Sequence, residues 1–321
     1  MKSIGIWLTA AIIAITVATP AKADFQSWLK KLRAEAASEG ISETTLTAAL
    51  NGIKPIPRVI ELDRKQPEFT LTFNEYMDRV IPRSRVEKGQ KKLLENKALL
   101  TEVSRKFGVP EKFLVAFWGI ETDFGRVTGG FKVIDALATL AYDGRRSKFF
   151  RRELLLALRV IEEGHIESNV MMGSWAGAMG QPQFMPSSFI GYAVDYDNDG
   201  RKDIWNTLAD VFASAANYLS RYGWRAGERW GRPVKVPEGF DPDRANLKVR
   251  KTVSGWASEG VTRLDGSPLP KSDLDASVIL PAGNEGPAYL VYKNYRVIMR
   301  WNRSHYFAMA IVRLADQISG Q

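Results

Sequence analysis

The chain has 321 residues, of which 45% are hydrophobic and 25% are charged, and its formal net charge is +9. This composition excludes a disordered chain and is sufficient for one large domain or two to three small ones with a sizeable core. The absence of cysteine excludes disulfides, thiolate metal sites, a cysteine nucleophile and a lipid-modified cysteine.

The first predicted element is an export signal at residues 1–23. Lys2 precedes an apolar run over 4–18, and the A-K-A at 21–23 has the small residues of a cleavage site, so we predict cleavage before Asp24. A membrane anchor is the competing interpretation, but the run is shorter than the roughly 20 residues that a spanning helix needs. The sequence predicts an exported, soluble, periplasmic protein without a stable membrane anchor.

The charge of the mature chain indicates its partners only broadly. Removal of the signal takes away Lys2 and Lys22 and no acid, so the chain stays basic. A basic exported protein suits an anionic partner such as a cell-wall polymer, a lipid surface or nucleic acid, although charge can also serve solubility alone. Since no arginine-rich tract or nucleic-acid motif is present, we expect no nucleic-acid partner.

Helical spacing dominates the chain up to about Trp230. An N-terminal helical region over 24–88 begins with two short helices, separated by Gly40 and capped at Ser42, and continues through a proline-punctuated segment. A core region over 89–228 follows. Its predicted helices cover 90–107, 111–122 (after Pro110), 133–140, 149–163 and 208–222.

The pattern after Trp230 changes to short β-rich runs between Gly, Pro, Asp and Asn. The runs are PVKVP, NLKVRKTVSGW, ASVILP and AYLVYKNYRVIMRW, and they predict a small antiparallel β domain over 229–298. Helical spacing returns in 299–321. The predicted fold class is therefore mainly α (α+β), with a small β domain inserted late in a helical protein.

Several enzyme chemistries are excluded by what the sequence lacks. The chain has only His165 and His305 and no HExxH, which argues against a zinc hydrolase. GSWAG around Ser174 lacks the spacing of a nucleophile elbow, and no phosphate-binding glycine loop is evident. Carboxylate chemistry remains, and we expect no organic cofactor.

The stretch FWGIETDFG places Glu121 near the end of a predicted helix among Phe117, Trp118 and Phe124. Apolar neighbours and the negative end of the helix dipole both raise the pKa of a carboxyl group, as a general acid requires. Lysozyme is a worked precedent for such an acid in glycoside cleavage. A solvated carboxylate at a frayed helix end is the competing interpretation, and Asp123 is expected to be a turn or capping residue.

The segment DYDNDGRKDIWN over 195–206 has the spacing of an EF-hand calcium loop, with Gly200 at the sharp turn. The predicted ligands are Asp195, Asp197, Asp199, the carbonyl of Arg201, Asp203 and Asn206. Asn206 replaces the usual bidentate glutamate, so we expect a reduced affinity for calcium. We expect the calcium to be structural, because its ligands are used to hold the loop. A solvated Asp-rich turn is the alternative.

Two further stretches could bind a ligand. GSWAGAMGQPQFMPSSF over 173–189 combines small residues with amides suited to sugars, or it could be a tightly packed core loop. YDGRR offers Arg145 and Arg146 to a substrate carboxylate, or it could be a solvated turn.

Taken in chain order, FWGIETDFG, YDGRR, GSWAGAMGQPQFMPSSF, the DxDxDGxxDIW loop and RWNRSHYFA resemble the lytic murein transglycosylase B family, glycoside hydrolase family 103. The resemblance covers nearly the whole mature chain. It implies a lysozyme-like helical core and non-hydrolytic cleavage of the bond between N-acetylmuramic acid and N-acetylglucosamine in peptidoglycan, giving 1,6-anhydromuramoyl products. It also implies that calcium occupies the loop.

The resemblance assigns roles to residues that match the family motifs. Glu121 matches the catalytic acid and base, and Trp301 stands where the family commonly has tyrosine. The implied substrate-binding residues are Ser174, Gln183, Arg145, Arg146, Tyr76, Tyr218 and Asn302. The implied partners are peptidoglycan glycan strands and wall-remodelling proteins. A non-catalytic wall-binding scaffold, a hydrolytic muramidase and a calcium-regulated interaction protein are the competing functions.

Overall fold

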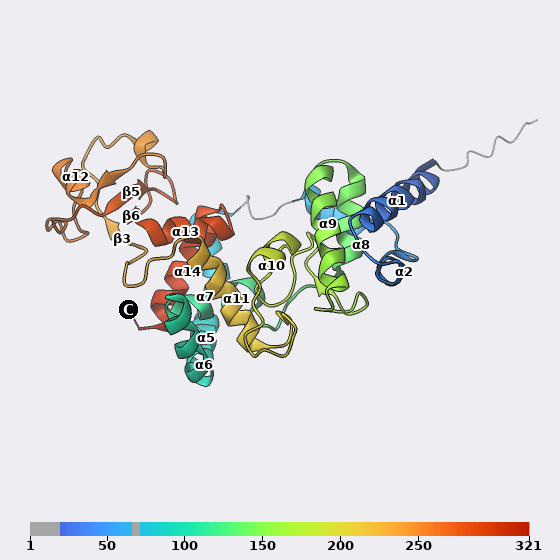
Figure 1. Cartoon of the computed structure of the whole chain (residues 1–321). Helices are drawn as coiled ribbons and strands as arrows, with labels where there is room; N and C mark the ends of the chain where they lie inside the picture. Colours follow the sequence, from blue (N-terminus) through green and yellow to red (C-terminus); the bar gives the residue numbers. More distant parts are fainter. Residues whose placement is uncertain (1–19, 66–70, 321) are drawn as a thin grey trace, which may run out of the picture.

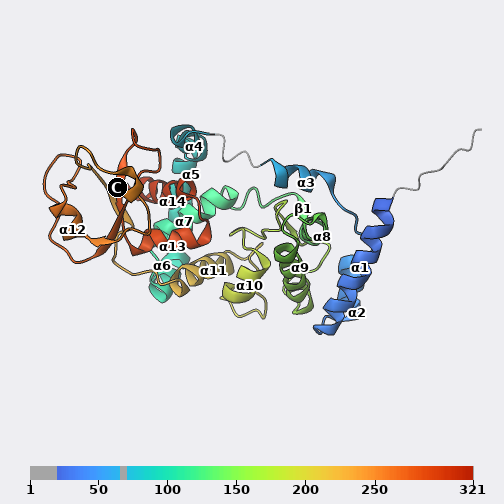
Figure 2. The ribbon, with the colours of Figure 1, turned by 90° about the horizontal axis from the view of Figure 1, so that it is seen from above.

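The computed structural model describes residues 20–65 and 71–320. Most of the predicted signal segment, residues 1–19, therefore lies outside the described residues. The molecule is elongated, with the N-terminal helices α1 and α2 at one end and the region of β3, β5, β6 and α12 at the other (Figures 1 and 2). None of the described helices is long and apolar enough to cross a membrane.

The N-terminal helices follow the predicted capping signals. The chain leaves α1 through Gly40, which has a φ of 88°, and Ser42 caps α2 by accepting a hydrogen bond from the Thr45 amide. Thr72 and Glu75 form a capping box at the start of α4. The helices are α1 (Pro20–Ser38), α2 (Glu43–Leu50), α3 (Pro57–Arg64) and α4 (Phe73–Val80).

Helix α7 forms the centre of the main core, where residues 113–119 are all buried. It packs against α5, α6, α11 and α14. The helices of this part are α5 (Arg83–Glu95), α6 (Lys97–Phe107), α7 (Glu111–Thr122), α8 (Val133–Asp143), α9 (Ser147–Glu162), α10 (Pro186–Tyr192), α11 (Leu208–Arg221), α13 (Lys293–Trp301) and α14 (His305–Ile318). The mainly helical fold class is confirmed.

The single helix predicted over 90–107 is wrong, because α5 ends at Glu95 and α6 begins at Lys97. Asn96 stands between them with a φ of −108°, and its side-chain amide donates to the carbonyl of Lys92 at 2.9 Å. An asparagine that bonds to the preceding turn competes with helix propagation. The apolar spacing continues across the break, so it does not reveal it.

A β lobe over residues 231–292 has a second hydrophobic core, which includes Trp256, Val278 and Leu290. Its antiparallel sheet has the order β3-β6-β5-β4, and α12 (Val253–Ser258) packs on β4. The strands are β3 (Gly231–Val234), β4 (Lys251–Thr252), β5 (Asp275–Ile279) and β6 (Ala288–Val291). The predicted small antiparallel sheet is confirmed, while the predicted domain boundaries stay predictions.

Residues 293–301 were expected to be β-rich and instead form α13. Tyr295, Val297 and Ile298 are buried in the main core, so the apolar residues at this point serve a helix face. Asn294 is fully buried and holds the loop between α11 and β3, accepting from the Arg225 amide and donating to the carbonyls of Arg225 and Glu228. Helix α13 thus returns the chain from the β lobe to the core.

Candidate active site

Glu121 lies in the last turn of α7, half-buried, as its position in the sequence predicts. The helix ends in three consecutive left-handed residues, with φ values of 50° at Asp123, 62° at Phe124 and 79° at Gly125. Residues other than glycine rarely adopt this conformation, and they persist in it only where the surrounding structure holds them. The backbone behind Glu121 is therefore strained and must be fixed by its contacts.

The end of α7 is tied to the loop over 173–189 through the buried Gln181. The indole of Trp118 donates to Gln181 Oε1 at 2.7 Å, and the hydroxyl of Thr122 donates to the Gln181 carbonyl at 2.9 Å. The Gly125 amide in turn donates to Thr122 Oγ1 at 3.1 Å. These bonds fix the position of Glu121 relative to the loop.

Asp123 acts as the C-cap of α7, which confirms the predicted capping role. Its carboxylate forms ion pairs with Arg126 at 2.6 Å, Lys88 at 3.2 Å and Arg85 at 3.6 Å. Burial acts to raise the pKa of Asp123, but hydrogen bonds from Arg126 and Lys88 hold this pKa below its usual range. Asp123 therefore stays ionised and serves the turn.

The aromatic residue that reaches Glu121 comes from the other end of the chain. Trp301, the last residue of α13, donates its indole N–H to Glu121 Oε1 at 2.7 Å. Its ring packs on Phe117 with a centroid distance of 4.5 Å. Trp118 and Phe124, also expected beside the carboxylate, pack against each other in the core at 5.6 Å.

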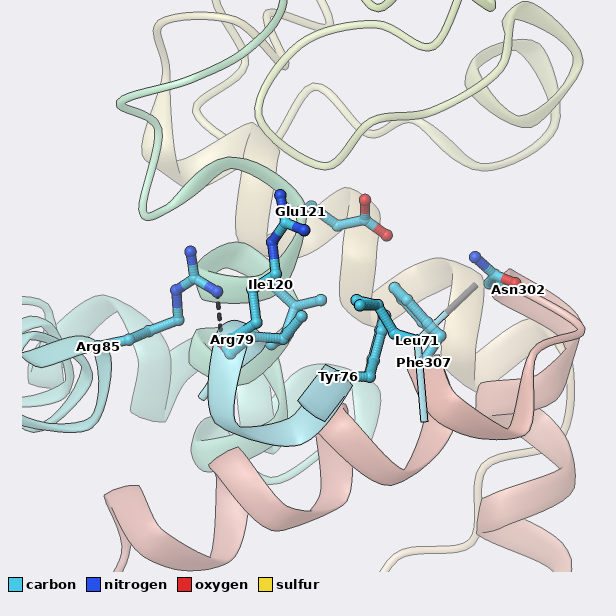
Figure 3. A pocket seen from close by; sticks show the side chains of 9 residues that line it. Leu71, Tyr76, Arg79, Arg85, Ile120, Glu121, Asn302 and Phe307 are labelled. Atoms are coloured by element: carbon cyan, nitrogen blue, oxygen red, sulfur yellow. Dashed lines mark hydrogen bonds between the residues drawn. The ribbon is translucent and has the colours of Figure 1, made fainter. Parts of the chain in front are cut away.

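Glu121 lines two adjoining pockets of about 440 and 320 Å³. Asn302 lines both of them and a third pocket of about 780 Å³, so the three pockets form one continuous depression, which we call the Glu121 groove. Figure 3 shows the first pocket, where the carboxylate of Glu121 and the amide of Asn302 lie above Tyr76 and Phe307. Arg79 and Arg85 line its other side.

Ser174 and Gln183 line the second pocket, as their predicted roles require. Ser174 Oγ accepts from the amides of Ala176 and Ala178 at 3.3 and 3.0 Å, so its O–H can donate to a ligand. Gln183 has a φ of 52°, and its Nε2 donates to the carbonyls of Thr128 and Gly180, both at 2.9 Å. Both side chains are held in place at the pocket wall.

Tyr76 and Tyr218 also lie in the groove. Tyr76 lines the first and third pockets and packs on Tyr306 at 5.5 Å. Tyr218 lines the second pocket, is 6% exposed and donates its hydroxyl to the carbonyl of Arg300 at 2.8 Å. Burial raises the pKa of Tyr218. Its ring forms part of the wall, and its hydroxyl is committed to the backbone.

The predicted arginine pair meets at one buried carboxylate. Arg145 and Arg146 both form ion pairs with Asp63 of α3, which is 1% exposed. Arg146 lines the third pocket, whereas Arg145 is not among the residues that line the groove. Two guanidinium groups share one carboxylate, so a positive charge remains beside the third pocket.

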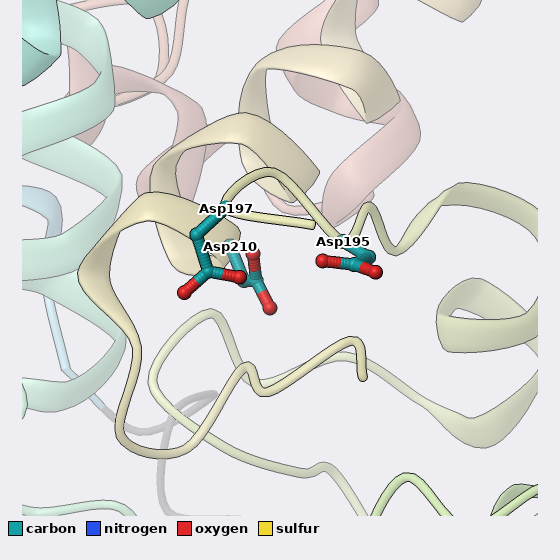
Figure 4. A group of neighbouring side chains, drawn as sticks. All are labelled: Asp195, Asp197 and Asp210. Carbon is teal, nitrogen blue, oxygen red and sulfur yellow. The ribbon is translucent and has the colours of Figure 1, made fainter. Parts of the chain in front are cut away.

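The predicted metal loop lies between α10 and α11, apart from the groove, and turns at Gly200 with a φ of 92°. Ligand atoms of Asp195, Asp197 and Asp210 all lie within 4.8 Å of one another, around a common space in Figure 4. Asp210 belongs to α11 and was not predicted from the sequence. Carboxylate oxygens are the ligands that calcium prefers, so this group fits it.

The other predicted ligands have partners within the loop. Asp199 Oδ1 accepts from the Arg201 amide at 2.8 Å, and Asp203 Oδ1 accepts from the Trp205 and Asn206 amides, both at 2.9 Å. The side-chain amide of Asn206 donates to Asp203 Oδ2 at 3.2 Å. These contacts shape the loop and leave Asp203 and Asn206 facing each other.

Asp210 is a buried carboxyl group that lies beside two other acidic residues. It is 1% exposed, and burial raises the pKa of its carboxyl group, with Asp197 and Asp195 adding to the rise. Its two oxygens accept from the amides of Tyr196 and Asp203, both at 2.7 Å. A divalent cation would offset both the burial and the repulsion.

A family model described as Transglycosylase SLT domain matches residues 24–316. The chain belongs to this transglycosylase family. The predicted resemblance to the lytic murein transglycosylases is thereby confirmed. The match covers the N-terminal helices, the Glu121 groove and the β lobe together.

One relative of this chain is membrane-bound lytic murein transglycosylase B of Escherichia coli (strain K12). The two proteins are 33% identical over 219 residues, and these residues make up 66% of this chain and 58% of that protein. The match thus spans little more than half of that relative.

Two solved structures of transglycosylases resemble more than nine-tenths of the chain. SltB3 from Pseudomonas aeruginosa, in complex with NAG-anhNAM-pentapeptide, has a TM-score of 0.89 and 43% identity, covering 92% of this chain and 80% of its own. The Escherichia coli lytic transglycosylase Slt35, in complex with calcium, has a TM-score of 0.80 and 28% identity, covering 91% and 92%. The lysozyme-like helical fold is confirmed by these matches.

Sequence reasoning missed three residues that shape this site. Trp301 was noted only for its departure from tyrosine, since nothing in the sequence places it 2.7 Å from Glu121. Gln181 was included only within its loop. One signal in the sequence could have pointed to Asp210. It is an acid in the first turn of the apolar helix α11, and a buried acid there needs a charged partner or a capping role.

Proposed function

We propose that the protein cleaves the glycosidic bond between N-acetylmuramic acid and N-acetylglucosamine in peptidoglycan without water, leaving a 1,6-anhydromuramoyl end. One observation carries the reaction type. Among the described residues that line the three pockets of the Glu121 groove, Glu121 is the only carboxylate. Glycosidases that hydrolyse their substrate commonly need a second one, either to activate water or to attack the sugar.

A single carboxyl group suffices if the substrate supplies the nucleophile. Protonated Glu121 gives its proton to the leaving glycosidic oxygen, and the C–O bond at the anomeric carbon breaks. As a carboxylate it then takes the proton of the muramic 6-hydroxyl, whose oxygen forms the new bond to the anomeric carbon. The attack is intramolecular, which removes the entropic cost of positioning a water molecule. Glu121 ends protonated and ready for another turnover.

The walls of the groove suit a sugar with an acidic side group. Ser174, Gln183 and Asn302 offer hydroxyl and amide groups to the glycan, while Tyr76 and Tyr218 offer ring faces. Arg146 is the cation of the pair that lines the groove, and we assign it to a lactyl or peptide carboxylate of the substrate. Arg145 shares Asp63 with it and holds the pair in place.

We further propose that calcium binds the loop over 195–206 in a structural role. Asp195, Asp197 and Asp210 would hold the ion, because their carboxylate atoms converge and Asp210 is buried among like charges. When bound, calcium supplies charge neutralisation that fixes the loop between α10 and α11. Asp210 lies in α11, which also carries Tyr218 of the groove.

The cellular setting also stays a proposal. The signal-like N-terminus and the basic mature chain support an exported periplasmic enzyme acting on an anionic wall. Its substrate would be glycan strands that carry peptides.

The experiment that tests this function compares Glu121→Gln with the parent on purified sacculi. We expect the parent to release muropeptides one water lighter than lysozyme products, and the variant to be slower by roughly 100- to 10,000-fold, the usual contribution of a general acid or base. Glu102→Gln is the matched control, because Glu102 Oε1 also accepts from an aromatic side chain, Tyr196, but lies outside the groove.

The competing functions give different results in the same experiment. Products with reducing ends would identify a hydrolytic muramidase with a base outside this groove. Equal activity of Glu121→Gln and the parent would remove Glu121 from the mechanism. Tight binding of sacculi without any release would identify a wall-binding scaffold.

A further inference from the structure

A separate pocket of about 430 Å³ lies at the β lobe, and the proposed reaction does not use it. It shares no lining residue with the Glu121 groove among the residues that the structure describes. Its lining residues are Arg229, Arg232, Pro233, Arg263, Leu264 and Asp265. Three arginines and one aspartate therefore line this pocket, which leaves it with a positive formal charge.

The pocket is assembled at the β3 edge of the sheet. Arg232 and Pro233 belong to β3, and Arg229 lies just before it. Arg263 comes from a turn that is held to the chain after β3, because Lys235 and Thr262 exchange backbone hydrogen bonds of 3.0 Å in both directions. The arginines are thus brought together by main-chain pairing.

None of these three guanidinium groups forms an ion pair with a described carboxylate. Two other arginines, Arg225 and Arg244, do have partners: Arg225 pairs with Glu228 at 3.2 Å, and Arg244 pairs with Glu259. Adjacent guanidinium groups repel one another, and a bound oxyanion would offset that repulsion.

Two acidic groups lie near the arginines, and one of them, Asp265, lines the pocket itself. Hydrogen bonds from Ser267 and the charge of Arg263 hold the pKa of Asp265 below its usual range. Asp265 Oδ1 accepts from the amide and hydroxyl of Ser267 at 2.9 and 2.6 Å, within its own turn. Glu228 Oε1 accepts from the Lys293 amide at 3.0 Å, and its Oε2 pairs with Arg225. The pocket therefore keeps a net positive charge.

Arg232 adds a second observation. Its guanidinium lies 5.8 Å from the ring centroid of Tyr292, and burial raises the pKa of Tyr292 while the charge and hydrogen bonding of Arg232 act to lower it. Arg232 Nε is buried and has no hydrogen-bond partner of normal geometry among the described residues. Unpaired buried polar atoms are uncommon in folded proteins, and they often mark a missing ligand or water.

The apolar part of the lining narrows the chemistry. Leu264 is 63% exposed, and Pro233 is also exposed, so a ligand in this pocket meets an aliphatic surface beside the guanidinium groups. A bare phosphate would use only the charges. A chain-terminal carboxylate next to a small aliphatic side chain would use both.

We propose that this pocket binds the C-terminal carboxylate of a short peptide that ends in a small aliphatic residue. In naming a wall peptide as its source, the inference rests on the proposed function. Such a site would hold the enzyme on a peptide stem while the Glu121 groove works on a glycan strand. It is a binding site only, and no bond is made or broken there.

The test measures binding of N-acetyl-D-alanyl-D-alanine and of its C-terminal amide to the full chain by calorimetry. We expect the acid to bind at least about tenfold more tightly than the amide, because charge-assisted hydrogen bonds to arginine are lost with the charge. Arg229→Gln and Arg263→Gln should each weaken the binding of the peptide acid by about tenfold. Both side chains are exposed, so the folded state should be kept.

Arg250→Gln is the matched control. Arg250 is an exposed arginine next to β4, at the opposite edge of the same sheet. Equal binding of acid and amide, or equal weakening by Arg250→Gln and Arg263→Gln, overturns the proposal. Binding of inorganic phosphate without binding of the peptide acid also overturns it.

Product analysis of the same preparations separates the two proposals. If the parent releases anhydromuropeptides but does not distinguish acid from amide, this inference fails alone. If the parent prefers the acid but releases no such products, the proposed function fails and the carboxylate site stands.

Discussion

Replacing Trp301 with phenylalanine should move the pH range in which the enzyme works. The substitution removes the indole N–H that lies 2.7 Å from Glu121 Oε1, while the aromatic ring can keep its packing on Phe117, Phe184 and Tyr218. The donor stabilises the charged form of the carboxyl group, so its removal favours the protonated form.

The size of the effect follows from the bond that is lost. A hydrogen bond to a charged group contributes about 1.5–3 kcal/mol, and the lower value applies here because Trp301 is only half-buried. Since ~1.4 kcal/mol is one pH unit in a protonation equilibrium, the protonated form should persist to about one pH unit higher.

The assay is the pH dependence of kcat/KM for the release of soluble muropeptides. A general acid must be protonated in the free enzyme, so the loss of activity at high pH should move upward by about one unit in Trp301→Phe. Trp205→Phe is the matched control, since the Trp205 indole donates to a backbone carbonyl, that of Met172, at 3.2 Å. A high-pH limit that stays in place or moves downward in Trp301→Phe refutes the reasoning.

Three further predictions concern stability. Calcium at about 100 times its dissociation constant should stabilise the fold by about 2.7 kcal/mol, and Asp195→Asn should abolish the thermal shift; a shift that survives the substitution contradicts the proposed ligand. Burial lowers the pKa of His305, so the unfolded chain takes up the proton first as the pH falls, and stability should decline below its unfolded pKa of about 6.5. His305→Gln should flatten this decline in thermal melts, and an unchanged slope would disprove the assignment. A Cβ at Gly129 would lie 2.0 Å from a backbone carbonyl oxygen at a φ of 108°, so Gly129→Ala should cost about 3 kcal/mol or more in urea unfolding, while Gly130→Ala, with open space around it, should stay within about 1 kcal/mol.

The sequence predicts the helices well where local signals and burial agree. Pro110 before α7 and Ser42 before α2 both stand where helices begin. Each of these residues acts through its own backbone or its nearest turn, so the information is local. Residues 293–301 were misjudged because their apolar residues fit both a strand and a helix. The buried Asn294, which holds a loop far away in sequence, is part of the tertiary context that a short window lacks.

The residues of the candidate site also fall into those that the local sequence reveals and those that only the fold brings together. Glu121 could be found from its surroundings in the sequence, because a carboxylate among aromatic residues needs a reason. The contact with Trp301 could not, since it joins residues 180 positions apart. Asp210 escaped for a related cause: the EF-hand spacing ends at residue 206, and only the fold of α11 carries this acid back to Asp195 and Asp197.

Digestion of sacculi in oxygen-18 water tests the central claim most directly, namely that Glu121 acts with a nucleophile supplied by the sugar itself. If the muramic 6-hydroxyl closes on the anomeric carbon, no solvent oxygen enters the product, and mass spectrometry should find unlabelled anhydromuropeptides. Incorporation of one oxygen-18 at the new end of every product would contradict the account.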